Sequence, residues 1–118
     1  MSQSEIESML NRIMDQIPEV EGIIAADGNG KKISGQTITE MDHDKIIKAV
    51  LTTFKASQEL GTVVEKGEAT EVRVNSKDGY TMIVGSKKLI LIAITALDAV
   101  NSVSLIVRNL HMILEQFG

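Results

Sequence analysis

Residues 89–94 read Leu-Ile-Leu-Ile-Ala-Ile, an apolar run with no polar side chain at any position. Successive side chains of a strand point to opposite faces of its sheet, so this segment is apolar on both faces. Such a strand needs cover on each side. The run therefore predicts a central strand in a sheet that lies between helices.

Three segments around this strand have the apolar spacing of amphipathic helices. They are residues 6–17, 43–60 and 98–117. Asp42 or Thr39 is expected to cap the middle helix at its start, and Gly61 to end it in a left-handed C-cap conformation. Asp98 is expected to cap the last helix.

Four more segments have the alternation and flanking turns of strands. They are residues 22–26, 31–35, 70–75 and 80–84. The glycine-containing stretch Asp27-Gly-Asn-Gly30 is expected to join the first two strands as a hairpin turn. The resulting order, α-β-β-α-β-β-β-α, predicts an α/β fold with three layers. A five-stranded, mostly antiparallel sheet then has helices on both faces, within a single domain over residues 1–118.

The composition excludes several classes of protein. The 118 residues include 16 Asp and Glu against 12 Lys and Arg, with two Phe and one Tyr as the aromatic residues. Nucleic-acid binders usually carry a basic face and stacking rings, so no nucleic-acid partner is expected. No apolar run approaches the ~20 residues that cross a bilayer, and residues 1–5 lack the basic end and apolar stretch that a signal peptide requires. We therefore expect a cytoplasmic protein without membrane insertion.

Motifs for catalysis, cofactors and metals are incomplete. Cysteine is absent, which excludes thiolate zinc sites and cysteine nucleophiles. Gly30-Lys31 matches the end of a phosphate loop, but Lys32 stands where the magnesium-binding hydroxyl belongs. His43 and His111 lie in different expected helices, and neither has a second ligand three or four residues away. We expect no cofactor, no metal and no enzymatic activity of the chain's own.

The middle helix carries more apolar surface than one contact needs. On a helical wheel, Ala49, Thr53, Ala56 and Leu60 extend its main apolar face into an arc of roughly 220°, against the ~100° or more of a single contact. One sheet cannot cover that arc, and small side chains let a second helix approach closely. The arc predicts a homodimer contact; the alternative is that residues 62–66 of the same chain cover this flank.

The segment 70–75 supports self-association. If residues 89–94 lie in the middle of the sheet, segment 70–75 is an edge strand, and it has neither the proline nor the inward charge that usually blocks edge pairing. Thr70, Val72 and Val74 share one face of it. Two copies can pair along this edge and continue the sheet across a two-fold axis.

The polar side of the middle helix is a second candidate surface. Five residues form it: Lys45, Lys48, Thr52, Lys55 and Glu59. A charged helical face is commonly only solvated, but it can also steer an acidic protein partner toward the molecule.

Several short motifs then follow one another in the order of a known family. They are Pro18-Glu-Val-Glu-Gly22-Ile-Ile, Asp27-Gly28, the small residues of the middle helix, Asp78-Gly79, and Leu89-Ile-Leu before the last helix. Over nearly the whole chain this order resembles the roadblock / dynein light chain family, which includes regulators of small GTPases.

The resemblance implies a profilin-like or longin-like domain that forms homodimers and serves as a platform for Ras-like small GTPases. Carried over by position, the dimer contacts would be Ala49, Thr53, Ala56, Leu60, Thr70, Val72 and Val74. The residues facing the GTPase would be Lys45, Lys48, Thr52, Lys55 and Glu59.

The resemblance leaves the mode of action open between an inserted arginine and selection of a GTPase conformation. Arg12 and Arg108 fall on outer helices and Arg73 on a strand, so none is presented on the expected helix pair. We therefore expect conformational selection. Two alternatives stay open: a structural adaptor or light chain that leaves GTP turnover unchanged, and a small-molecule sensor domain.

Overall fold

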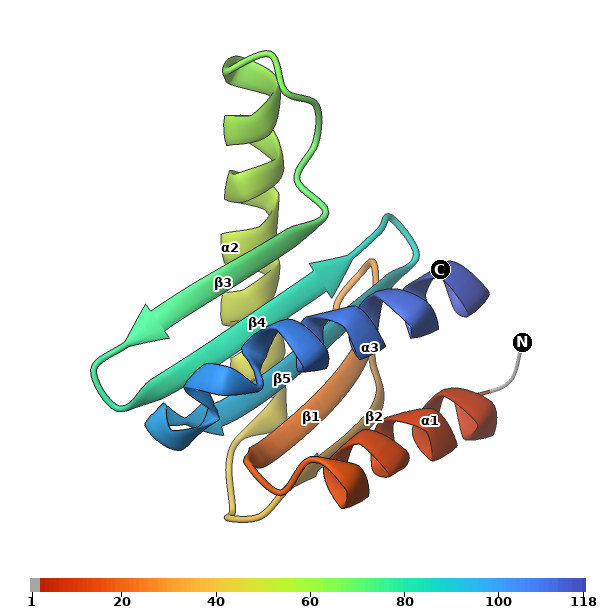
Figure 1. The fold of residues 1–118 in the computed structure, drawn as a ribbon. Coiled ribbons are helices and arrows are strands. Elements are labelled where there is room, and N and C mark those ends of the chain that lie inside the picture. The colour runs from red at the N-terminus through yellow and green to blue at the C-terminus, as the bar shows by residue number, and fades with distance from the viewer. Residues whose placement is uncertain (1–2) are drawn as a thin grey trace.

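The computed structural model describes residues 3–118 and forms from them three α-helices, one 3-10 helix and five strands (Figure 1). In chain order these are α1 (Gln3–Gln16), β1 (Val20–Asp27), β2 (Lys32–Thr37), α2 (His43–Val63), β3 (Glu71–Ser76), β4 (Gly79–Gly85), β5 (Leu89–Ala96), η1 (Leu97–Asn101) and α3 (Val103–Phe117). The α/β fold with the order α-β-β-α-β-β-β-α is confirmed. Among the described residues, none of the helices has the length and apolar character that spanning a bilayer requires.

The strands form one sheet in the order β2-β1-β5-β4-β3, and every neighbouring pair is antiparallel. β5 lies in the middle, and its residues Leu89 to Ala93 are all buried. The run of apolar residues therefore has the central place that its two-sided apolar character predicts.

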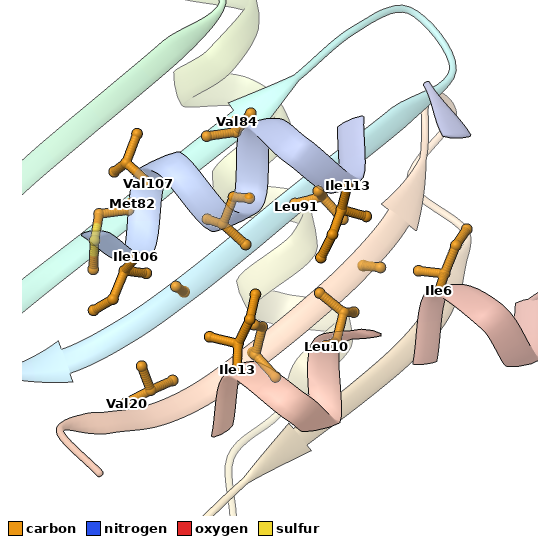
Figure 2. Packing of buried hydrophobic residues seen from close by; sticks show 14 of the residues in the cluster. Ile6, Leu10, Ile13, Val20, Met82, Val84, Leu91, Ile106, Val107 and Ile113 are labelled. Atoms are coloured by element: carbon orange, nitrogen blue, oxygen red, sulfur yellow. The ribbon is translucent and has the colours of Figure 1, made fainter. Parts of the chain in front are cut away.

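Two separate hydrophobic clusters hold the three layers together. On one face of the sheet, α1 and α3 cover the side chains of Leu89, Leu91 and Ala93, as Figure 2 shows for part of the cluster. On the other face, α2 packs against Ile90 and Ile92. Alternate residues of one strand thus serve both clusters, which fixes the register of β5 against its neighbours.

The turn between β1 and β2 is the expected hairpin turn. One carboxylate oxygen of Asp27 accepts hydrogen bonds from the backbone N–H groups of Asn29 and Lys31, each 2.9 Å long. These bonds, with that of Lys31 foremost, lower the pKa of the Asp27 carboxyl below its ordinary value. Gly30 has a φ of 90°, a conformation that favours glycine. The backbone of the turn therefore stabilises the ionised form of the Asp27 side chain.

The end of α2 differs from the prediction. Gly61 does not form a left-handed C-cap: it lies inside the helix, which runs to Val63, and the positive φ falls on Glu65 at 61°. The glycine is needed for a tertiary reason, because a Cβ atom at Gly61 would lie 2.1 Å from the carbonyl oxygen of Gly67. The segment after the helix folds back onto this position.

Two other boundaries also differ. Asp98 does not cap the last helix: it lies within η1, whose residue Ala99 is fully buried, and α3 begins only at Val103. Strand β3 begins at Glu71, so Thr70 stands just before it and is exposed. At the start of α2, by contrast, Asp42 is the N-cap and accepts a hydrogen bond from the backbone N–H of Lys45, as expected.

Candidate interaction surface

Helix α2 covers its face of the sheet alone and extends beyond it. Its buried residues Ile47, Val50 and Phe54 pack on β1, β4 and β5. Figure 1 shows α2 crossing behind the strands and its last turns projecting past the edge strand β3. The first two thirds of the helix are thus fixed by the core, and the projecting end has no sheet of its own chain beneath it.

The flank predicted as a dimer contact is exposed in the single chain. Ala49 and Ala56 are exposed, Thr53 is half-buried, and Leu60 keeps 62 % of its surface exposed. The hydroxyl of Thr53 donates to the carbonyl oxygen of Ala49 at 2.9 Å. Because this hydroxyl is already bonded within the helix, the flank presents methyl groups and no unmet polar group.

The alternative cover for this flank is wrong. All residues from 62 to 66 are exposed, and Thr62 and Val63 belong to α2 itself. Val63 keeps 71 % of its surface exposed and Val64 is also exposed, so they enlarge the apolar surface next to Leu60. We call Leu60, Val63 and Val64 the α2 overhang. Sequence reasoning missed the last two residues because it ended the helix one turn too early.

The edge strand β3 is the last strand of the sheet that α2 crosses before the overhang projects past it (Figure 1). It pairs with β4, and within residues 3–118 no strand lies along its outer side. Val72 packs against the cluster under α2, and Val74 on the same face is 36 % exposed. Register places Val74 opposite Thr81 and Thr81 opposite Ile94. All three are only partly covered, so they form a row across three strands on the α2 face.

The other face of β3 is tied to α3 by polar contacts. One carboxylate oxygen of Glu71 lies 2.8 Å from Nε2 of His111, and the other accepts a 2.9 Å hydrogen bond from Nε of Arg73. Partial burial raises the pKa of the Glu71 carboxyl, but these two partners lower it by more, so the net pKa is below the ordinary value. The edge strand is therefore held to both helical layers.

The polar side of α2 is open to solvent. All five residues predicted to face a partner are exposed: Lys45, Lys48, Thr52, Lys55 and Glu59. Within residues 3–118, none of the three lysines has an ion-pair partner. Their charges are thus available to a second molecule.

The histidines serve structural contacts. Nε2 of His43 lies 3.1 Å from the hydroxyl of Thr37, and His111 contacts Glu71. In the part of the chain that the structure describes, no group of three or more His, Asp or Glu side chains is arranged to hold a metal ion.

A family model of the Roadblock/LC7 domain matches residues 6–96. The chain belongs to the Roadblock/LC7 family, as the order of its motifs suggested. Family membership supports the general class that the resemblance implied, a regulator or scaffold in small-GTPase systems. No curated protein shows significant sequence similarity to the chain.

Solved structures share the fold at low sequence identity. A Roadblock/LC7 domain from Streptomyces avermitilis has a TM-score of 0.78 at 10 % identity, with 93 % of this chain and 92 % of that chain covered. MglB from Myxococcus xanthus has a TM-score of 0.76 at 16 % identity, with 98 % and 91 % covered. The gliding protein MglB from Thermus thermophilus has a TM-score of 0.71 at 11 % identity, with 81 % and 75 % covered. The expected longin-like α/β architecture is confirmed.

Proposed function

We propose that this protein is a non-enzymatic homodimeric platform that binds and regulates a Ras-like small GTPase. The observation that carries the proposal is the exposed apolar flank of α2, which ends in the overhang, on a molecule whose β3 edge is also open within residues 3–118. An apolar surface of this kind on a small domain is typical of a protein interface.

The surface is complementary to itself. If the β3 strands of two copies pair about a two-fold axis, the sheet continues from one copy into the other. The α2 overhang of each copy, which lacks a sheet beneath it, then lies above the partner's β3 and β4. The half-covered row Val74, Thr81 and Ile94 is on that face. Each copy thus supplies a helix end without a sheet beneath it and a half-covered row of strand residues, while Leu60 and Val63 continue the flank of Ala49 and Ala56 toward the partner's α2.

Pairing of this kind also builds a larger polar surface. The two α2 helices lie on the same side of the continuous sheet, so their exposed lysines face solvent together. Lys45, Lys48 and Lys55 of both copies then form the basic part of one platform, with Thr52 and Glu59 beside them. Positive charge of this kind increases the rate of association with an acidic partner surface.

The positions of the arginines favour regulation without an arginine finger. Arg12 and Arg108 belong to α1 and α3, on the opposite face of the sheet from α2. Arg73 lies on β3 and is engaged with Glu71. A platform without an inserted arginine acts by binding one conformation of the GTPase more tightly than another.

GTP hydrolysis by a Ras-like GTPase, measured with and without the protein, tests this proposal. We expect a changed rate that Arg12→Ala, Arg73→Ala and Arg108→Ala leave within about twofold. A loss near the ~10³-fold of a true arginine finger in any of them contradicts conformational selection. Binding of the GTPase with an unchanged rate supports the structural adaptor instead.

Self-association is tested separately. Ala49→Glu combined with Ala56→Glu places charges on the flank, which is costly in an interface and tolerated on an exposed helix. We expect a folded monomer by sedimentation velocity. An unfolded double variant means that the flank belongs to the core, and a dimer of unchanged affinity means that it is not the contact.

A further inference from the structure

The sheet has a second open edge, along β2, that the platform does not use. β2 is the terminal strand of the sheet next to β1. The backbone N–H of Ile38 donates to the carbonyl oxygen of Glu21, and the register places Thr37 opposite Gly22. Hydrogen-bonded and non-bonded pairs alternate in an antiparallel ladder, so the N–H and C=O groups of Gly35 and Thr37 point away from β1. Within residues 3–118 no strand pairs with these groups, so they can receive a strand from another molecule.

The carbonyl of Ile33 supports this orientation. Its oxygen accepts a 2.6 Å hydrogen bond from the side-chain amide of Gln3 in α1, so it points out of the sheet like those of Gly35 and Thr37. Gln3 covers that end of the edge. The part of β2 that stays open is therefore the segment from Gly35 to Thr37.

A broad, shallow hollow, largely open to solvent, runs along this part of the edge. Its volume is about 800 Å³, and it lies between β2, the connection from β2 to α2, and the first turn of α2. Two large apolar residues of the connection, Ile38 and Met41, are 65 % and 38 % exposed. Glycine at position 35 leaves room for the His43 ring beside the strand, because a Cβ atom there would lie 2.8 Å from Nδ1 of His43.

The charge of the hollow selects between possible occupants. The hollow is lined by three acidic residues, Glu40, Asp42 and Asp44. Its basic lining residue is Lys32, with His43 nearby. A second copy paired on β2 would bring the same acids close to these ones, which repels. A basic segment meets complementary charge instead.

We propose that the β2 edge binds an extended segment of another protein, rich in apolar and basic residues, by strand addition. Backbone hydrogen bonds to Gly35 and Thr37 hold the segment in register with the sheet. Its apolar side chains contact Ile38 and Met41, and its basic side chains face the acids of the hollow. This site lies at the opposite edge of the sheet from β3, so a platform dimer keeps one such site at each end.

Fluorescence anisotropy with a labelled peptide of about eight alternating valine and lysine residues tests the site, since strands of this length are ordinary. We expect saturable binding, and NMR hydrogen exchange should slow at the amides of Gly35 and Thr37. Those of Ser34 and Gln36 already point toward β1 and serve as internal controls. The same peptide with every backbone nitrogen methylated should bind at least about tenfold more weakly, because it has lost its hydrogen-bond donors.

Two charge-reversal variants complete the test. Glu40→Lys with Asp44→Lys should weaken binding of the valine–lysine peptide by about tenfold or more at low salt. The matched control, Glu7→Lys with Asp15→Lys on the exposed side of α1, changes net charge equally and should bind within about twofold of the wild type. If the methylated peptide binds as tightly as the unmethylated one, charge attraction alone explains the binding, and the proposal of strand addition is overturned. Absence of binding at millimolar peptide also overturns the proposal. Protection of the Gly35 and Thr37 amides that increases with protein concentration in the absence of peptide overturns it as well, because it would show that a second copy of the chain occupies the edge.

Discussion

Replacing Leu60 with alanine tests whether this residue belongs to a dimer interface or to the core of the single chain. Leu60 is 62 % exposed at the end of α2. Complete burial of a leucine side chain contributes about 1.5–3 kcal/mol, so covering the exposed part contributes about 1–2 kcal/mol in each copy. A two-fold interface uses the residue twice, and alanine keeps only the Cβ atom. We therefore expect dimerisation to weaken by about 2–3 kcal/mol, which raises the dissociation constant about 30- to 150-fold.

Sedimentation velocity over a dilution series measures this dissociation constant, and urea unfolding of the dilute monomer measures stability. The free energy of unfolding of the monomer should change by less than about 0.5 kcal/mol, since the residue is exposed and alanine favours helix. Leu105→Ala is the matched control, because Leu105 is 52 % exposed on α3, across the sheet. An unchanged dissociation constant for Leu60→Ala, or a loss of about 2 kcal/mol or more in monomer stability, refutes the reasoning.

Four further changes follow from the same structure. Phe54→Ala should lower the free energy of unfolding by about 3–5 kcal/mol in urea titrations, because the ring fills the cluster under α2; a loss below about 1 kcal/mol would show that the cluster is loosely packed. Gly61→Ala should not give the ~1 kcal/mol of added stability that alanine normally brings inside a helix, because the new Cβ atom would clash with the carbonyl oxygen of Gly67. A measured gain in the free energy of unfolding of that size would show that the segment at Gly67 moves aside at little cost. Glu71→Gln should lower the free energy of unfolding by about 0.5 kcal/mol at pH 7. Because the pKa of Glu71 is lowered in the folded state, the wild type is more stable than the variant above pH 4.5, and this difference fades as the pH falls through the lowered pKa. A difference that persists in acid would contradict this origin. Lys48→Glu with Lys55→Glu should slow association with the GTPase in stopped-flow measurements at low salt. Arg12→Glu with Arg108→Glu, which changes the net charge equally on the opposite face of the sheet, should not. Equal effects of the two pairs would mean that the polar side of α2 is not the docking face.

Those parts of the fold that rest on repeated apolar spacing could be predicted from the sequence. The stripe of Ile6, Leu10 and Ile13 defined α1, and the two-sided run at 89–94 placed β5 in the middle of the sheet. Each pattern involves many side chains that gain from the same burial, so one atypical residue does not obscure it.

Boundaries and contacts made by single residues could not be predicted in this way. Gly61 has the signature of a helix end, but the reason for glycine there is the carbonyl of Gly67, which approaches only in the folded chain. The same error hid Val63 and Val64 from the candidate surface. The pairing of Glu71 with His111 joins residues 40 positions apart, and no local spacing signals it.

Hydrogen–deuterium exchange of the wild-type chain at two protein concentrations, one far above and one far below the dissociation constant, tests self-association through α2 and β3 most directly. Pairing of two copies predicts slower exchange at the higher concentration, confined to the backbone of residues 71–76 and to the last turns of α2. Identical exchange at both concentrations in a chain that sediments as a dimer, or protection that appears along β2 instead, contradicts the proposed interface.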